Sequence, residues 1–271
     1  QKSPPMRKPL FSGHSAVVTG AGEGIGFEIA RLLALSGAVV VLNDVDATRA
    51  HNAAAAIQRQ GGHCIGIAGD VGDVDVVRGL VEAAVREGGK ITIAVANAGQ
   101  TLWNSFLDYT PEDLQRVMNV NLGGSFFLAQ AAARHMLKQG TGGRILFMSS
   151  VTGHQAVPYL SAYSMTKAGL EMLARNLVLE LSPHKITVNC IAPGATVTPR
   201  NLADDPDYEA HWAELSPSRR AAFPSDIARA ALFLLAPSSD QITGQTLVID
   251  GGWSVVSPVP ALDFVAQPQS E

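Results

Sequence analysis

Tyr163 and Lys167 are the two residues whose types and spacing most directly suggest chemistry. On a helix, side chains four positions apart lie on one face, about one turn from each other. An ammonium group beside a phenol stabilises the phenolate, so the tyrosine can exchange a proton with a substrate at neutral pH. Surface neighbours on many helices share this spacing, so the interpretation needs support from residues elsewhere in the chain.

Further polar residues are predicted to lie close to this pair. Ser149-Ser150 ends one apolar run that is typical of a strand, and Asn97-Ala98-Gly99 ends another. Open α/β sheets bind ligands at the carboxyl ends of their strands. Asn121 lies among apolar residues in the next helical segment, where it is either part of the site or a core amide with satisfied hydrogen bonds. These positions predict an active site at one edge of a sheet.

A glycine-rich segment, Thr19-Gly20-Ala21-Gly22-Glu23-Gly24-Ile25-Gly26, follows the first predicted strand and opens the first predicted helix. The backbone N–H groups and dipole of a helix N-terminus can hold a pyrophosphate, and glycines allow close approach. The spacing is Gly-x-x-x-Gly-x-Gly rather than the general Gly-x-Gly-x-x-Gly fingerprint, and a purely structural turn is the alternative. The strand-turn-helix context favours a dinucleotide site.

Asp44 ends the second predicted strand, 18 residues after Gly26. A carboxylate there can bind the adenosine ribose hydroxyls, whereas the 2′-phosphate of NADP would meet like charge. At 4 Å and an effective dielectric constant of 20 this repulsion is about 4 kcal/mol, and a third of it gives about tenfold discrimination. Glu23 and the absence of Lys or Arg at positions 43–46 also favour NAD. The alternative role for Asp44 is to cap the following helix.

Strand-like runs alternate with helical patterns along most of the chain. The runs are 16–19, 38–42, 64–68, 91–96, 144–149, 186–191 and 247–249, with room for crossover helices between them. Such alternation predicts an α/β, single-domain, doubly wound (Rossmann) parallel sheet of about seven strands with helices on both faces. We expect the domain to span residues 13–253, with 198–223 as a substrate flap and 1–12 and 254–271 as terminal arms.

Composition narrows the class of protein. The chain has 271 residues, 46% of them hydrophobic, and a formal net charge of −4 without a long run of one sign, which argues against a nucleic-acid or membrane surface. There are two cysteines, Cys64 and Cys190, in strand-like runs, so buried thiols in a cytoplasmic protein are expected. The seven histidines show no close metal-ligand pairing, and we predict no metal site. A soluble enzyme acting on a small molecule fits best.

With these motifs in this order, the chain resembles the single-domain short-chain dehydrogenase/reductase family over nearly all of residues 13–253. The resemblance implies NAD-dependent oxidoreduction with a tetrad of Asn121, Ser150, Tyr163 and Lys167, Ser150 being chosen over Ser149 because it lies thirteen residues before the tyrosine. The cofactor contacts it implies are Gly20, Gly22, Glu23, Gly24, Ile25, Gly26, Asp44, Asp70, Val71, Asn97, Ala98, Gly99, Tyr163, Lys167, Pro193, Gly194, Thr196 and Thr198. Thr196 departs from the family, which more often has an apolar residue there.

The resemblance leaves the substrate open. We expect hydride transfer between NAD(H) and a secondary alcohol or ketone, such as a small sugar, polyol or related hydroxy compound. One alternative is a 3-oxoacyl carrier-protein reductase, and another is a sensor that binds the dinucleotide without catalysis. Family members are commonly homotetramers, so a homo-oligomer (tetramer or dimer) is expected by analogy. The candidate specificity residues are Trp103, His154, Gln155, Tyr208 and Trp212.

Overall fold

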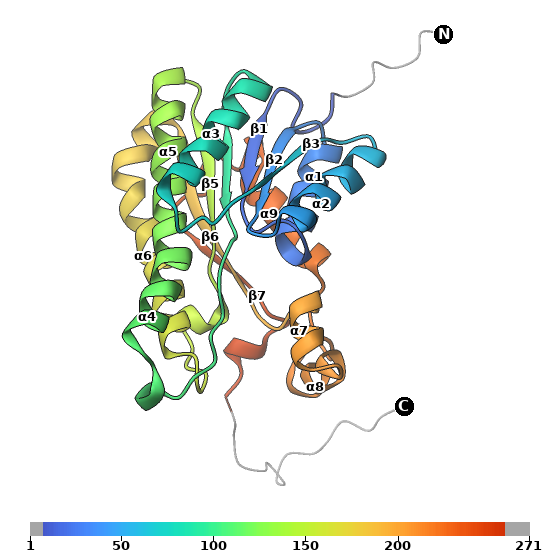
Figure 1. The fold of residues 1–271 in the computed structure, drawn as a ribbon, viewed down its shortest axis with the longest axis vertical. Coiled ribbons are helices and arrows are strands. Elements are labelled where there is room, and N and C mark those ends of the chain that lie inside the picture. The colour runs from blue at the N-terminus through green and yellow to red at the C-terminus, as the bar shows by residue number, and fades with distance from the viewer. Residues whose placement is uncertain (1–7, 258–271) are drawn as a thin grey trace.

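Seven parallel strands form the centre of the molecule in the computed structural model, which describes residues 8–257 (Figure 1). Their spatial order is β3-β2-β1-β4-β5-β6-β7. The strands are β1 (Ser15–Val18), β2 (Val39–Asp44), β3 (His63–Ala68), β4 (Ile93–Ala96), β5 (Gly143–Met148), β6 (Ile186–Pro193) and β7 (Thr246–Ile249). The predicted α/β fold with a doubly wound, Rossmann-like parallel sheet is confirmed.

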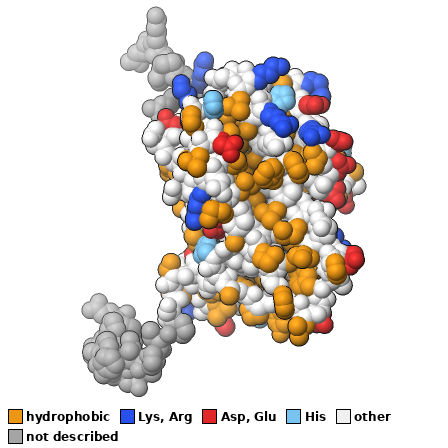
Figure 2. All heavy atoms as spheres, turned by 90° about the vertical axis from the view of Figure 1, so that its left-hand side faces the viewer, with side chains coloured by type: hydrophobic (Ala, Val, Ile, Leu, Met, Phe, Trp, Pro, Cys, Tyr) orange, Lys and Arg blue, Asp and Glu red, His pale blue; other side chains and the backbone are white. Residues whose placement is uncertain are grey.

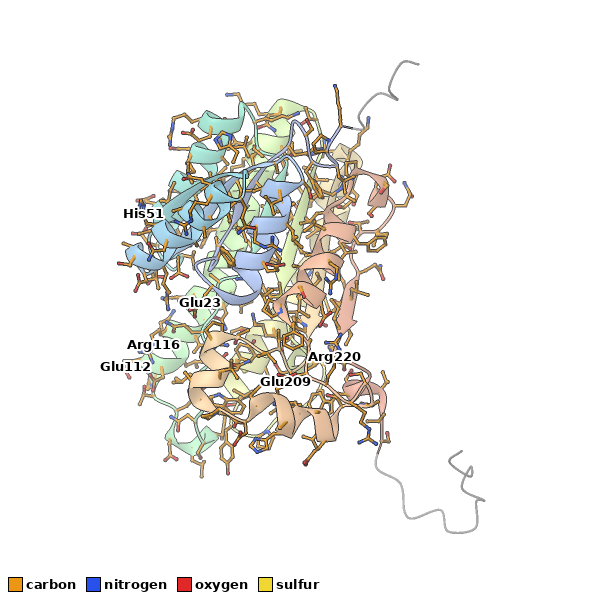
Figure 3. All side chains as sticks on the ribbon, turned by 90° about the vertical axis from the view of Figure 1, so that its right-hand side faces the viewer. Glu23, His51, Glu112, Arg116, Glu209 and Arg220 are labelled. Atoms are coloured by element: carbon orange, nitrogen blue, oxygen red, sulfur yellow. The ribbon has the colours of Figure 1, made fainter. Side chains whose placement is uncertain are left out.

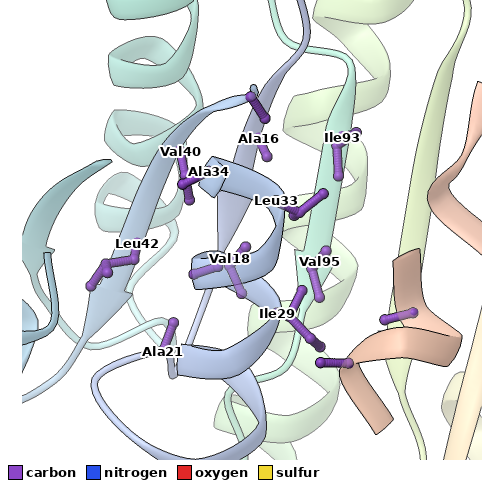
Figure 4. Packing of buried hydrophobic residues seen from close by; sticks show 14 of the residues in the cluster. Ala16, Val18, Ala21, Ile29, Leu33, Ala34, Val40, Leu42, Ile93 and Val95 are labelled. Carbon is purple, nitrogen blue, oxygen red and sulfur yellow. The ribbon is translucent and has the colours of Figure 1, made fainter. Parts of the chain in front are cut away.

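Helices cover both faces of this sheet. One face carries α1 (Gly24–Leu35), α2 (Ala47–Arg59) and α9 (Pro224–Leu235), and the other carries α3 (Val74–Gly88), α5 (Ser125–Gln139) and α6 (Ser161–Leu181). Figure 4 shows the first face, where Ile29 and Leu33 of α1 pack near Val18 of β1 and Val95 of β4, all of them fully buried. Burying one such side chain contributes about 1.5–3 kcal/mol. Strands covered on both faces explain why the apolar runs lack polar alternation.

The sheet topology determines where a ligand can bind. The chain moves outward from β1 to β2 and β3, then crosses back to place β4 on the other side of β1. Beyond the carboxyl ends of β1 and β4, the connecting loops therefore diverge and leave a crevice. After β4 the chain continues into α4 (Pro111–Met118), a π-helical turn (Asn119–Gly124) and then α5.

The predicted flap differs from expectation in being largely helical. It contains α7 (Pro199–Asp204) and α8 (Tyr208–Leu215), whereas residues 198–223 show only weak periodicity in the sequence, which is typical of an irregular loop. Thr198 caps α7 by accepting a hydrogen bond from the Asn201 N–H, and Pro199 occupies its first turn. Helices of six and eight residues are too short to show a clear periodicity, which is why the pattern missed them.

The N-terminal boundary of the domain also lies earlier than expected. Phe11 falls within the predicted arm 1–12, yet its side chain is fully buried in the core and its N–H donates to the Ser36 carbonyl. The segment from Pro9 therefore belongs with the domain. Residues 1–7 and 258–271, which make up most of the two predicted arms, lie outside the described residues.

Candidate active site

A cleft of about 380 Å³ occupies the crevice at the carboxyl ends of the strands. Most of the predicted site residues line it, although they come from the first to the last third of the chain. The predicted residues on its wall are Gly20, Glu23, Gly24, Ile25, Gly26, Asp44, Asp70, Val71, Asn97, Ala98, Gly99, Ser150, Tyr163, Lys167, Pro193, Gly194, Thr196 and Thr198. Gly22 and Asn121 are predicted residues that do not line the cleft, and each instead supports residues that do.

Gly20 and Gly26 of the glycine-rich loop are packed so closely that side chains would not fit there. A Cβ at Gly26 would lie 2.4 Å from Asn97 Nδ2, and one at Gly20 would lie 2.7 Å from Ala98 Cα. Asn97 Nδ2 donates to the carbonyls of Thr19 and Gly20, which binds this loop to the end of β4. The glycines therefore serve close backbone packing between β1, α1 and β4.

The N-terminus of α1 faces the cleft and fits a dinucleotide pyrophosphate. Its first residues, Gly24 to Gly26, line the cleft, and the N-cap residue Glu23 makes no side-chain cap hydrogen bond. Gly24 has φ +61°, and a Cβ there would meet only Thr198 at 3.5 Å, so open space lies above the helix. Free backbone N–H groups at a helix N-terminus are suited to bind phosphate oxygens.

Asp44 is held in place at the other end of the cleft. Its Oδ2 accepts a 3.1 Å hydrogen bond from the Gly22 N–H, and its Oδ1 accepts one of 3.0 Å from the Asp46 N–H. Arg49 of α2 adds bonds of 3.2 Å from Nε and 3.0 Å from Nη2 to Oδ1, and its Nη1 lies 3.8 Å from Glu23. Figure 3 shows Glu23 at the start of α1. The alternative role of Asp44 as a helix cap is wrong, because Asp46 caps α2.

Arg49 is the most important residue that sequence reasoning missed. Positions 43–46 hold no cation, but the first turn of α2 brings Arg49 back onto Asp44 and into the cleft. The pattern Asp44-x-Asp46-x-x-Arg49 was the available signal, since an N-cap at Asp46 places Arg49 in that first turn. The Asp44 carboxylate, for which the sequence indicated no neighbouring cation, therefore forms an ion pair with Arg49.

Tyr163 and Lys167 lie one turn apart on α6, and both line the cleft. Lys167 is only 3% exposed, its Nζ donates a 2.7 Å hydrogen bond to the Met148 carbonyl, and it lies 5.2 Å from the centre of the Tyr163 ring. A buried ammonium is retained only where hydrogen bonds compensate for lost hydration. The arrangement keeps a positive charge beside the tyrosine without letting the lysine reach solvent.

Asn121 lies in the π-helical turn and is fully buried. Its Oδ1 accepts from the Gln100 N–H at 2.8 Å, and its Nδ2 donates to the Gln100 carbonyl at 3.0 Å and to Thr166 Oγ1 at 3.1 Å. Thr166 Oγ1 donates in turn to the Tyr163 carbonyl. Asn121 thus links the loop after β4 to the helix that carries Tyr163 and Lys167. We predicted a continuous helix here, whereas the structure has a π-helical turn containing Gly123 and Gly124.

The two neighbouring serines have different surroundings. Ser149 Oγ points to Lys167 O at 3.1 Å and Glu171 Oε1 at 2.8 Å, both within α6. Ser150 Oγ accepts a 3.2 Å hydrogen bond from the Thr152 N–H, which leaves its own hydroxyl hydrogen available. Both serines line the cleft, but only Ser150 keeps a donor for a bound molecule.

Residues at the start of the predicted flap, and Thr196 just before it, line the cleft. Thr196, Thr198, Arg200 and Asn201 line the cleft, and the Thr196 carbonyl accepts from Asn201 Nδ2 at 2.9 Å. Thr196 is buried, and its hydroxyl also donates to the Gly194 carbonyl, so it stabilises the segment that leads into the predicted flap. Burial raises the pKa of Tyr208 to about 12, against the opposing effects of the Thr196 backbone and Arg200, so this second tyrosine stays neutral.

The candidate specificity residues have different surroundings in the structure. Trp212 packs edge-on against Trp253 with ring centroids 5.3 Å apart, and Tyr208 lies beside it at 6.0 Å, so this part of the flap is an aromatic packing cluster. Trp103 is 57% exposed and does not line the cleft, and His154 contacts Glu171. Cleft residues that were not predicted are Asn43, Val45, Arg49, Gly69, Gln100, Thr101, Val120, Met148, Ser149, Pro199, Arg200 and Asn201.

The described residues form neither a metal site nor a membrane span. Between residues 8 and 257, no group of three or more His, Cys, Asp or Glu side chains is placed to hold a metal ion. Over the same described range, no helix has the length and apolar character needed to cross a membrane.

Comparison with known proteins defines the class. Residues 20–254 match the family model described as enoyl-(acyl carrier protein) reductase. A short-chain dehydrogenase/reductase of Armillaria gallica is 39% identical, over 90% of this chain and 97% of its own. Tetrahydroxynaphthalene reductase of Pyricularia oryzae is 35% identical over 89% and 90% of the chains, and L-rhamnose-1-dehydrogenase of Scheffersomyces stipitis is 35% identical over 90% and 96%.

Solved structures indicate the same class of protein. A short-chain type dehydrogenase/reductase from Mycobacterium marinum superposes with a TM-score of 0.85 at 37% identity, covering 90% of this chain and 96% of that one. A 7α-hydroxysteroid dehydrogenase, solved with NADH and a 7-oxo bile acid, gives 0.85 at 36% identity over the same shares. The fold and cleft are those of a nicotinamide-dinucleotide oxidoreductase that acts on alcohols or ketones. The chain belongs to the short-chain dehydrogenase/reductase family.

Proposed function

We propose that this protein transfers hydride between NAD(H) and a secondary alcohol or ketone, with Tyr163 as the catalytic acid/base. The observation that carries the proposal is the buried Lys167 ammonium beside the Tyr163 ring, at the cleft wall that also presents Ser150. A sensor that only bound the dinucleotide would have no use for a desolvated lysine beside a tyrosine. This arrangement therefore favours an enzyme over the non-catalytic alternative.

Each residue of the tetrad has a role that follows from its contacts. The Tyr163 hydroxyl exchanges a proton with the substrate oxygen, and the Ser150 hydroxyl donates a hydrogen bond to the same oxygen. Lys167 stabilises the phenolate through its charge and is oriented by the Met148 carbonyl. Asn121 positions α6 through Thr166. The bound nicotinamide supplies or accepts the hydride.

Replacement of Tyr163 by phenylalanine tests this assignment. Tyr163→Phe keeps the ring that packs beside Lys167 but removes the proton, so turnover should fall by at least about a thousandfold while the protein folds normally. Tyr159→Phe is the matched control, because Tyr159 is 65% exposed and its change should leave turnover within about twofold. Retention of most of the activity by Tyr163→Phe would contradict the proposal.

We propose NAD(H) as the preferred cofactor, on the strength of Asp44. The carboxylate is 6% exposed and held by the Gly22 and Asp46 N–H groups, so it cannot turn away from a ribose in the cleft. Asp44, Glu23 and Arg49 together carry a net charge of −1, which opposes a 2′-phosphate. Arg49 weakens that opposition and is the group that would contact a phosphate.

Asp44→Asn tests the cofactor preference. Asparagine has the same shape, but the change removes the like charge and leaves Arg49 without its partner. The ratio of kcat/KM values for NADP⁺ and NAD⁺ should rise at least about tenfold, since even a third of the Coulomb term gives this factor. The control is Asp46→Asn, which removes the same charge from the exposed cap of α2. Tighter binding of NADPH than NADH by the unmodified protein would overturn the NAD assignment.

For the substrate, we propose a small sugar, polyol or related hydroxy compound. Similarity to an L-rhamnose-1-dehydrogenase supports this choice, whereas similarity to a tetrahydroxynaphthalene reductase supports an aromatic ketone. The carrier-protein alternative requires basic residues at the cleft mouth. Arg200 lines the cleft, but the charge of Arg220 in the flap is opposed by Asp226, at 2.6 Å, and to a smaller extent by Glu209 (Figure 3). Activity should be assayed with sugars, polyols, naphthol-type ketones and 3-oxoacyl thioesters. Thioesters as the best substrates would reverse the choice.

We also propose that the protein forms homo-oligomers through the outer face of α4, α5 and α6. Figure 2 shows apolar side chains gathered over this side of the molecule. The exposed apolar residues on these helices are Leu114, Phe126, Phe127, Leu137, Met165, Met172 and Leu179. Contiguous apolar surface of this kind marks an interface. Light scattering should give the mass of a dimer or tetramer, and Phe126→Glu together with Met172→Glu should reduce it.

Finally, we propose a cytoplasmic location, because Cys64 and Cys190 are fully buried free thiols rather than a disulfide, as expected in a reducing compartment.

A further inference from the structure

Glu171 is a buried carboxylate that the proposed chemistry does not use. It follows Lys167 by one turn of α6 and is only 7% exposed. Its Oε1 accepts a 2.8 Å hydrogen bond from Ser149 Oγ and lies 3.4 Å from His154 Nδ1. A carboxylate in such a position is tolerated because polar groups surround it, and breaking these contacts would leave a charge with little hydration.

The residues that Glu171 contacts are the two ends of one short segment. Ser149 follows β5, and His154 follows the short 3₁₀ turn Val151–Gly153. The backbone between them also passes close to the carboxylate, since a Cβ at Gly153 would lie 2.8 Å from Glu171 Oε1. Ser150 lies inside this segment, and its hydroxyl accepts a hydrogen bond from the Thr152 N–H in the same segment. The placement of Ser150 therefore depends on how the whole segment is held against α6.

We propose that Glu171 is a positioning residue for the reaction, because its carboxylate ties both ends of the segment that presents Ser150 to the helix that carries Tyr163 and Lys167. The inference rests on the roles proposed above for Ser150 and Tyr163. One rigid helix then sets the separation of the two hydroxyls that contact the substrate oxygen. A displacement of about 1 Å between such groups can reduce turnover about a hundredfold.

Two substitutions of Glu171 distinguish a role in positioning Ser150 from a role in the stability of the fold. Glu171→Ala should fold, because Ser149 Oγ still has the Lys167 carbonyl at 3.1 Å as an acceptor and His154 is partly exposed to water. Its kcat should fall about 10- to 100-fold, while the KM for the cofactor stays within about twofold. Glu171→Gln keeps an acceptor oxygen for Ser149 and should recover kcat to within about fivefold of the original value. Glu180→Ala, at an exposed glutamate of the same helix, is the control.

The decisive experiment is a double-mutant cycle with Ser150→Ala, with all variants assayed for kcat on the best substrate of the panel. If Glu171 acts through Ser150, Glu171→Ala should reduce kcat less than about threefold once Ser150 is already alanine. An equal reduction in both backgrounds, or a failure of Glu171→Gln to recover activity, would overturn the inference. These results are distinguishable from a failure of the proposed function, which would appear as an active Tyr163→Phe protein.

Discussion

Removal of the Asn121 side chain should destabilise the protein measurably, although the residue does not line the cleft. Asn121→Ala deletes one acceptor and two donor contacts, which join the Gln100 backbone to Thr166 of α6. Each such bond contributes about 1 kcal/mol net. Water can replace part of the loss at Gln100, so the expected decrease in the free energy of unfolding is about 2–3 kcal/mol.

Asn121→Asp gives a sharper version of the same test. The carboxylate is the same size, but one of its oxygens replaces the N–H group that donates to the Gln100 carbonyl and to Thr166. An oxygen facing a carbonyl in a fully buried site is repelled, and burial favours the protonated carboxyl. Relative to the original protein, this variant should therefore be more stable at pH 5 than at pH 8.

Thermal unfolding monitored by circular dichroism at a fixed scan rate measures both effects. For a chain of this size, 2–3 kcal/mol corresponds to a decrease in Tm of about 4–12 °C. Asn119→Ala is the matched control from the same π-helical turn, because its side chain is exposed and holds a single bond from Gln115. A Tm of Asn121→Ala within 1 °C of the original would refute the reasoning about buried amide contacts.

Two further predictions follow from shifted pKa values. A hydrogen bond from Arg220 lowers the pKa of Asp226 from its ordinary 3.8 to about 2, so this pair adds about 1–2 kcal/mol of stability that is present above pH 4 and lost as the pH falls toward 2. Asp226→Asn should lack this loss when the free energy of unfolding is measured between pH 4 and pH 2. The same pH dependence in the variant and the original protein would contradict the prediction. Burial raises the pKa of Cys64 and Cys190 to about 12, so iodoacetamide at pH 8 should modify neither thiol until the protein is unfolded. Mass spectrometry measures the labelling, and rapid labelling of the native protein would show that the thiols are not buried.

The sequence was sufficient for the fold and for the residues whose signals are local. Strand-like runs, the glycine-rich segment and the Tyr163–Lys167 spacing each lie within a few residues, and the confirmed parallel order places them at one sheet edge. Short elements were harder, since α7 and α8 are stabilised by caps and by aromatic contacts such as Trp212 with Trp253 rather than by a periodic apolar stripe. Phe11 was missed for a related reason, because a single buried residue in a polar, proline-containing segment has no period.

The charged residues that line the cleft or contact its wall were the least predictable part of the site. Arg49 and Glu171 each lie near a predicted residue along the chain, Arg49 five positions after Asp44 and Glu171 four after Lys167. Helical spacing indicates that such residues share a face, but not whether that face is exposed. Only the packing of α2 beside β2 shows that Arg49 lines the cleft. Only the packing of α6 against β6 and the 3₁₀ turn shows that Glu171 is buried against Ser149 of the cleft wall.

The two charged clusters are held by different elements: one lines the cleft, and the other contacts the cleft wall at Ser149. Asp44 and Arg49 depend on β2, α2 and the glycine-rich loop, whereas Glu171 and Ser149 depend on α6 and the end of β5. No hydrogen bond or ion pair among the described residues joins one cluster to the other. Energetic effects of substitutions at such independent sites add. Substitutions at Asp44 or Arg49, the residues proposed to recognise the adenosine end, should therefore leave unchanged the geometry of the proton transfer proposed for Tyr163.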